Sequence, residues 1–423
     1  MSRPFYGWAI VAVAFCLHFA VSGCVYYAFG VLFKPISQEL AAGARTGVGS
    51  VLPLLNVVVG LSGPFVGRAL DGRGIRRMLL AGVALLSLGF LALSQVRSLF
   101  ELFLSYAILI AGGTALAGNL PCSTLVSNWF VRRRGRALGV AQLGISLSGV
   151  SMVWVASALV EFVGWRGAAA GFAAFSAALL LPLVALFAVD RPEARGLHPD
   201  GLAALSGSDP AAAAEAAPRD TRALLRDPRL WILSICIGVC ASATGTLVQQ
   251  IHAFATDLGH ALLEVTSVLS LLALGSALGK PVFGLFADRS GGRAALAGCL
   301  AIQLAGVACL LAVEGLGALR AAAALFGLGM GGLMPVWGHL VGSVFGRASF
   351  GRSMGLMGLV MLPLQVAGGP LAAWIHDRTG SYRPAFAIFI AMYLVALGLL
   401  ARLDGEGTRG PGRFGSADSG ASG

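Results

Sequence analysis

The sequence predicts an all-α polytopic membrane protein, with twelve transmembrane helices arranged as two six-helix parallel repeats around a central cavity. Composition is the first observation, since 57% of the 423 residues are hydrophobic and only 12% are charged. The second is a set of twelve apolar stretches, each about the 20 residues that a helix needs to cross a hydrocarbon core roughly 30 Å thick. The third is a pair of motifs that recur in both halves of the chain. Together these observations exclude a soluble domain.

The apolar stretches fall into two sets of six, separated by a polar segment. The first set covers residues 8–33, 46–70, 78–96, 99–126, 136–162 and 167–188, and the second covers 230–256, 263–287, 294–313, 318–344, 353–375 and 385–400. The polar segment is rich in Ala, Pro, Asp and Arg, and the end of the chain is rich in Gly and Ser. We therefore expect an N-terminal six-helix half (1–189), a cytoplasmic linker (190–229) with a short helix near 221–225, a C-terminal six-helix half (230–403) and a disordered cytoplasmic tail (404–423).

Two motifs repeat at an offset of 216–217 residues. The first reads Gly67-x-x-x-Asp71-Gly-Arg73-Gly74-x-Arg76 after the second stretch and Gly284-x-x-x-Asp288-Arg289-x-Gly291-x-Arg293 after the eighth. The second reads Gly135-Arg136-Ala-Leu-Gly139 at the start of the fifth stretch and Gly351-Arg352-Ser-Met-Gly355 at the start of the eleventh. Several matches at one spacing indicate a duplicated half, and parallel repeats of this kind place a binding site at their interface.

The net charge of +11 is explained by topology. The segments expected to be cytoplasmic hold 22 of the 30 Lys and Arg residues, among them those of the linker and of the loops after the second, fourth and eighth stretches. Loops rich in Lys and Arg face the cytoplasm, which predicts a multi-pass protein of the inner (plasma) membrane with both termini cytoplasmic. The basic excess therefore does not indicate a nucleic-acid partner. The seven cysteines lie within apolar stretches and form no CxxC pair, so we expect neither a metal site nor a cofactor.

Lys280 is the one permanent charge deep within an apolar stretch. An ammonium there costs roughly 2.5–3.5 kcal/mol on insertion scales, and it usually has a function. Pro281 follows it and cannot donate to the carbonyl of Ala277, which favours a cavity wall over a lipid-facing surface. No Asp or Glu occupies a mid-span position, so an anionic substrate is the expected counter-charge. The alternative is a lysine that extends toward the interface, about 10 Å away along the helix.

Other mid-membrane polar and aromatic groups are candidates to orient such a substrate: Tyr26, Tyr27, Asn119, Gln142, Trp337 and Gln365. For each of them, packing between helices is the competing interpretation. His252 is a candidate for proton coupling, and His18 and His260 are further groups that could titrate. Protons could also travel on the substrate or on the lysine.

The repeated Gly-x-x-x-Asp…Gly-x-Arg loops resemble the signature of the major facilitator superfamily, and the resemblance covers the whole chain. It implies that the loop residues brace a closed inner gate. Asp71 and Asp288 are expected to face the N-termini of the helices that follow them, where the helix dipole favours a carboxylate. The arginines expected to join neighbouring helix ends are Arg73, Arg76, Arg77, Arg289 and Arg293. The alternative is that these arginines only set the topology.

A narrower resemblance links the chain to monocarboxylate transporters and the related oxalate/formate exchangers. It rests on Trp129-Phe130-Val-Arg132-Arg133 after the fourth stretch and on the opening Tyr6-Gly7-Trp8. Lys280-Pro281 stands where that family has arginine and proline, and Ser276 stands where its animal proton-coupled members have aspartate. The resemblance implies carboxylate recognition at Lys280, with the family's aspartate absent.

The sequence thus predicts a secondary active transporter that moves a small organic anion, foremost a monocarboxylate, by alternating access. Its expected partners are the anion, protons and the lipid bilayer, and we expect a monomer. A facilitator-superfamily efflux pump for drugs or other metabolites is the alternative, although the fifth stretch lacks the proline of the drug-antiporter motif. A non-transporting membrane sensor ranks lower. An enzyme is not expected, because no catalytic constellation gathers at one membrane depth.

Overall fold

The computed structural model describes residues 5–40, 45–201, 219–257, 262–312 and 315–402, and all regular structure in these ranges is helical. The first half contains α1 (Gly7–Val21), η1 (Ser22–Tyr27), α2 (Ala28–Leu40), α3 (Arg45–Gly49), α4 (Val51–Arg73), α5 (Ile75–Gln95), α6 (Leu99–Leu104), η2 (Ser105–Ile110), α7 (Ala111–Ala117), α8 (Asn119–Trp129), α9 (Arg134–Phe175), η3 (Ser176–Leu180) and α10 (Leu181–Phe187). The second half contains α13 (Pro228–Asp257), α14 (Leu262–Ser290), α15 (Gly292–Leu311), α16 (Leu316–Val344), α17 (Phe350–Thr379) and α18 (Arg383–Ala401). Between the halves lie the short turns η4 (Pro192–Arg195) and η5 (Pro199–Gly201) and the helix α12 (Thr221–Arg226), where the sequence predicts a short helix.

Eleven helices among the described residues are long and apolar enough to cross a membrane. One of them, Arg134–Phe187, has 54 residues and would extend about 80 Å if straight, more than twice a hydrocarbon core. It is broken at Gly164, whose φ of 71° and ψ of 172° are not helical. The break divides the segment into two crossings, so the expected total of twelve crossings is confirmed. The all-helical fold class is confirmed with it.

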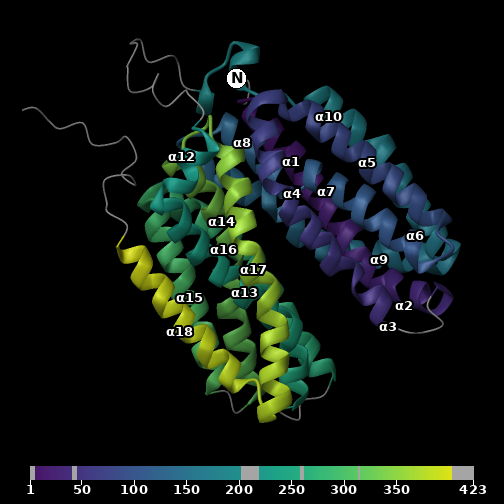
Figure 1. Cartoon of the computed structure of the whole chain (residues 1–423), viewed down its shortest axis with the longest axis vertical. Helices are drawn as coiled ribbons and strands as arrows, with labels where there is room; N and C mark the ends of the chain where they lie inside the picture. The colour runs from purple at the N-terminus through teal and green to yellow at the C-terminus, as the bar shows by residue number, and fades with distance from the viewer. Residues whose placement is uncertain (1–4, 41–44, 202–218, 258–261, 313–314, 403–423) are drawn as a thin grey trace, which may run out of the picture.

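Each half has its own apolar core. One cluster of buried hydrophobic side chains lies between Ile10 and Ala188, and a second lies between Leu224 and Leu400. Figure 1 shows the two bundles close together near α8 and α12 and separated toward α2 and α3. We call the end of the molecule at α8 and α12 the linker end. The halves therefore diverge from a shared contact at the linker end.

Two helix pairs supply most of the contacts between the halves, α4 with α17 and α9 with α14. We call them the α4–α17 seam and the α9–α14 seam. In the first, a Cβ on Gly355 would collide with the backbone of Gly63; in the second, a Cβ on Gly135 would collide with that of Gly284. Residues without a side chain are needed at such points, because the helix backbones touch. The repeated glycines of the sequence thus form the contacts between the halves.

Candidate functional site

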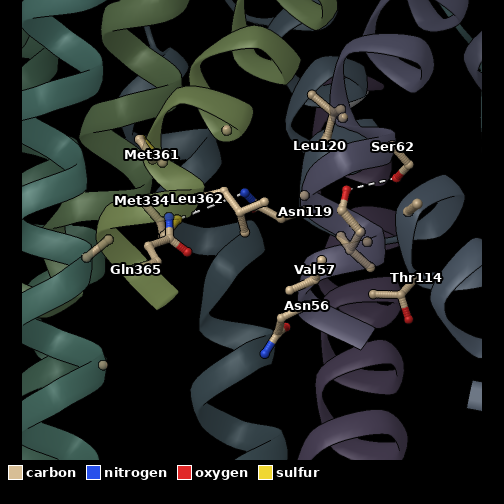
Figure 2. Close-up of a pocket in the computed structure, with 18 of the residues that line it drawn as sticks. Asn56, Val57, Ser62, Thr114, Asn119, Leu120, Met334, Met361, Leu362 and Gln365 are labelled. Atoms are coloured by element: carbon tan, nitrogen blue, oxygen red, sulfur yellow. Dashed lines mark hydrogen bonds between the residues drawn. The ribbon is translucent and has the colours of Figure 1, made fainter. Parts of the chain in front are cut away.

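A cavity of about 680 Å³ lies between the two halves, within the range of roughly 300–1,000 Å³ typical of small-molecule sites. The first half contributes residues of α1, η1, α4, α7, α8 and α9, and the second contributes residues of α13, α16 and α17. Figure 2 shows side chains of both halves directed into this space. None of the described lining residues is Asp, Glu, Lys or Arg. The lining is therefore made of neutral polar and apolar groups, together with one histidine.

Four of the predicted residues line this cavity: Tyr26, Asn119, Trp337 and Gln365. The Tyr26 hydroxyl donates to Asn56 Oδ1 over 3.0 Å, which joins η1 to α4. Trp337 lies on α16, and its indole Nε1 is buried without a hydrogen-bond partner among the described residues. In Figure 2 the amides of Asn119 and Gln365 extend into the cavity from opposite halves. These residues supply donors on both sides of the central space.

Asn119 begins α8 directly after a break at Gly118, whose ψ of −148° ends α7. Its Oδ1 accepts hydrogen bonds from Gln142 Nε2 over 3.4 Å and from Ser123 Oγ over 3.3 Å. Its Nδ2 faces Met334 Sδ across the cavity at 3.9 Å. Gln142 is fully buried and is not part of the lining. Gln142 therefore orients Asn119, whose amide N–H groups point toward the opposite half.

Tyr27 differs from Tyr26 in direction. Its ring packs on α9, where a Cβ added to Gly149 would lie 2.8 Å from it, and it does not belong to the cavity lining. Of the two tyrosines, Tyr26 is therefore the one that faces the cavity.

Lys280 lies in the α9–α14 seam, with 6% of its surface exposed. Its ammonium donates to Ser146 Oγ on α9 at 2.5 Å and to Ser276 Oγ on its own helix at 3.4 Å. No carboxylate of the described residues lies within 4.0 Å of it. Lys280 is not itself a lining residue, but Ile145, next to Ser146, is. The cation thus lies just behind the cavity wall, held by the opposite half rather than extended toward the helix end.

His18 on α1 also belongs to this region. It lines the cavity, is 2% exposed, and its Nε2 has no hydrogen-bond partner among the described residues. It also lies within electrostatic range of Lys280. The sequence offered only one signal for it, a histidine inside an apolar stretch. The structure places it in the cavity wall, on the same side as the polar groups of the first half.

A carboxylate joins the two halves in the same way in each seam. Asp71 accepts from the backbone N–H groups of Gly351 and Arg352, each over 3.1 Å. Asp288 accepts from those of Gly135 at 2.7 Å and Arg136 at 3.0 Å. The expectation that the carboxylates face helix N-termini holds, but the helices are α17 and α9 of the opposite half rather than those that follow in sequence. The side chains of Arg352 and Arg136 lie 3.9 Å and 3.6 Å from the same carboxylates.

The predicted gate arginines act differently. Arg76 donates to the carbonyl of Ala185, and Arg293 donates to that of Ala401 over 2.7 Å, so each joins helices within one half. Arg77 and Arg289 are exposed. The side chains of Arg73 and His252 lie outside the described part of the chain. Among the described residues, the arginines that lie beside a carboxylate of the opposite half are instead Arg136 and Arg352, whose signal in the sequence was the second repeated motif.

Comparisons with known proteins agree with this architecture. The family model described as Major Facilitator Superfamily matches residues 13–259 and 230–419. Monocarboxylate transporter 13 of Bos taurus is 29% identical over 407 residues, which cover 94% of this chain and 89% of that protein. Monocarboxylate transporter 11 of Mus musculus is 30% identical over 404 residues, covering 90% and 84%. The crystal structure of the human organic anion transporter MFSD10 superposes with a TM-score of 0.73 at 16% identity, covering 94% of this chain and all of that one, which supports the fold.

Proposed function

Since this chain belongs to the major facilitator superfamily, a family of transporters, we propose that it is a secondary active transporter for a small organic anion, foremost a monocarboxylate. Two relatives at 29–30% identity are named monocarboxylate transporters, which supports this substrate class. The relatives are transporters rather than enzymes, and the cavity between the halves is the natural place for a transported molecule.

The observation that carries the proposal is the environment of Lys280. Its ammonium is buried, and its partners among the described residues are two neutral hydroxyls. A buried cation without a counter-ion is costly, and an anion that enters the adjacent cavity lowers that cost. The carboxylate therefore approaches the α9–α14 seam, where displacement of Ser146 frees the ammonium for a charge-assisted hydrogen bond.

Neutral groups orient the bound anion. Lysine provides a compact charge without the planar fork of arginine, so direction must come from other donors. Asn119, Trp337 and Gln365 supply N–H groups from both halves around the cavity. This arrangement fits a substrate with one carboxylate and a small number of further polar atoms.

Transport proceeds by alternating access in this proposal. The seams close the linker end, and Asp71 and Asp288 act as gate residues because their hydrogen bonds join the halves. When these hydrogen bonds break, the linker end opens, and when the opposite end of the molecule closes, the anion can leave on the other side of the membrane. The abundance of arginine near the linker end supports a cytoplasmic position for that end, with the protein in the inner (plasma) membrane. Protons are the expected coupling ion, by a route that does not use the family's aspartate.

Uptake of radiolabelled lactate, pyruvate, formate and oxalate into proteoliposomes tests the proposal. Lys280→Gln should abolish saturable uptake, while Lys280→Arg should retain part of it because the charge remains. Lys34→Gln is the matched control, since Lys34 is the only other lysine of the chain and is exposed. Uptake that survives in Lys280→Gln would contradict the role of the cation. Absence of uptake of these four acids and also of butanoate and hexanoate by folded wild type would favour the drug-efflux alternative.

A further inference from the structure

The internal repeat places Lys280 opposite a symmetric counterpart that carries no charge. At the offset of 217 residues, Lys280-Pro281 of α14 corresponds to Gly63-Pro64 of α4. The structure confirms the equivalence, because Lys280 contacts Gly139 in one seam as Gly63 contacts Gly355 in the other. One seam therefore holds an ammonium, and the other holds a glycine that lines the cavity. The positive charge near the cavity therefore lies on the side of the α9–α14 seam only.

The cavity walls are divided by polarity in the same sense. The first half contributes most of the polar groups: His18, Ser22, Tyr26, Asn56, Ser62, Thr114 and Asn119. The wall from the second half is mainly apolar, and α17 supplies most of it. We call this the apolar wall; it consists of Met334, Met354, Met361, Leu362, Val366 and Pro370. The first half also contributes aliphatic residues, among them Val57, Leu120 and Ile145, so the difference is that polar groups are concentrated in the first half, whereas the wall of the second half is mainly thioether and aliphatic.

We infer that the substrate is an amphipathic monocarboxylate, with its single carboxylate at the α9–α14 seam and an apolar chain or ring, larger than that of lactate, against the apolar wall. This inference rests on the proposed function and specifies its substrate class. A dicarboxylate would have to bury its second charge near Gly63 or against methionine and leucine, where the described residues offer no cation, and such burial is strongly unfavourable. Acids such as oxalate are therefore excluded.

The size of the cavity agrees with this substrate class. A two- or three-carbon acid takes up the space of only a few water molecules, each about 30 Å³, whereas the cavity measures about 680 Å³. A longer apolar body would contact the flexible methionine side chains, which adapt to ligands of differing shape. Burial of each additional methylene group then strengthens binding by up to about fourfold.

Binding of an acid series to the purified full-length protein, followed by isothermal titration calorimetry, tests the inference. Kd should fall about two- to fourfold per methylene group from acetate through butanoate to hexanoate. Succinate should bind at least about tenfold more weakly than butanoate, which has the same number of carbons. A flat series, or succinate equal to butanoate, overturns the inference and leaves the proposed function intact. Absence of binding by every acid overturns the proposed function itself.

Two variants test the walls separately. Leu362→Asn should reduce the hexanoate-to-acetate affinity ratio, whereas Leu397→Asn on α18, outside the cavity, should keep it. Gln365→Lys adds a second cation to the lining and should raise the succinate-to-butanoate affinity ratio about tenfold or more. An unchanged ratio in both Leu362→Asn and Gln365→Lys would place the apolar body elsewhere. Because each readout is a ratio within one protein, partial loss of folded material does not affect it.

Discussion

Asp71 at the end of α4 accepts a hydrogen bond of 3.1 Å from the backbone N–H of Gly351 near the start of α17. A side chain from one half thus caps a helix of the other half, and the repeat places Asp288 in the same relation to α9. Caps satisfy N–H groups that a helix leaves unpaired, and a carboxylate also interacts favourably with the helix dipole. In the proposed alternating-access cycle these caps would break when the linker end opens, so we expect them to stabilise the closed state relative to the open one.

Asp288→Ala is expected to shift the protein toward the state that is open at the linker end. Loss of a helix cap costs about 0.5–2 kcal/mol, which changes the ratio of the two states roughly two- to thirtyfold. The measurement is the distance between spin labels on Arg77 and Arg402, two exposed positions in opposite halves, in a cysteine-free background. Asp200→Ala is the control, because Asp200 accepts three backbone hydrogen bonds from Val131, Arg132 and Arg133 that join the linker to the first half and do not connect the two halves. Equal distance distributions in Asp288→Ala and wild type would contradict the gating role.

Gly284→Ala is expected to weaken the same closure by a steric route. A Cβ at this position would overlap the carbonyl of Gly135 in the other half, and overpacking of such a contact typically costs about 1–3 kcal/mol. The seam should separate, and the exchange between states should slow or become one-sided, so the rate of uptake should fall at least about tenfold. Gly30→Ala is the matched control, since nothing lies within 4 Å of a Cβ there. Equal uptake rates in the two variants would show that the seam tolerates a methyl group.

The comparison of sequence and structure separates what periodicity can predict from what it cannot. Apolar length predicted the crossings, and the repeat predicted which loops are equivalent. Neither the apolar length nor the repeat identifies which residues a given side chain contacts. The carboxylate of Asp71 was therefore expected at the N-terminus of the following helix, although it binds that of α17. The sequence also did not predict the directions in which the Tyr26 and Tyr27 side chains point. The π-helical segment Ser22–Tyr27 shifts these side chains from the positions they would have in a regular α-helix.

Lys280 illustrates a further limit of the sequence. Its unusual position indicated a function, but only the structure shows that Ser146 of the opposite half holds the ammonium behind the wall. His18 had little signal in the sequence, since a single histidine in an apolar stretch is more often structural. Its significance depends on an unpartnered Nε2 at the cavity, which is a property of packing between helices.

Replacement of His18 is expected to weaken substrate binding without destabilising the protein. Its buried Nε2 is available to donate to a bound carboxylate, and a hydrogen bond to a charged group contributes about 1.5–3 kcal/mol. His18→Leu should therefore raise the Kd for the transported acid roughly ten- to a hundredfold, measured by calorimetry. His18→Asn should lose less, because its amide keeps a donor.

Thermal unfolding of the same variants separates binding from structure. A buried polar group without a partner costs free energy, so His18→Leu should unfold at the same temperature as wild type or higher. A lower unfolding temperature combined with an unchanged Kd would assign His18 a packing role instead.

Ser276→Asp is expected to make uptake depend on pH. The Ser276 hydroxyl lies 3.4 Å from the Lys280 ammonium, so an aspartate there would form an ion pair with it and compete with the substrate carboxylate. At neutral pH the Kd for the acid should rise at least about tenfold. As the pH falls, protonation of the new carboxyl would free Lys280, and uptake should recover more steeply than in wild type. Ser276→Asn is the matched control, because it has the same size and no charge. Uptake that responds to pH equally in the Asp and Asn variants would mean that the substrate does not bind through the Lys280 ammonium.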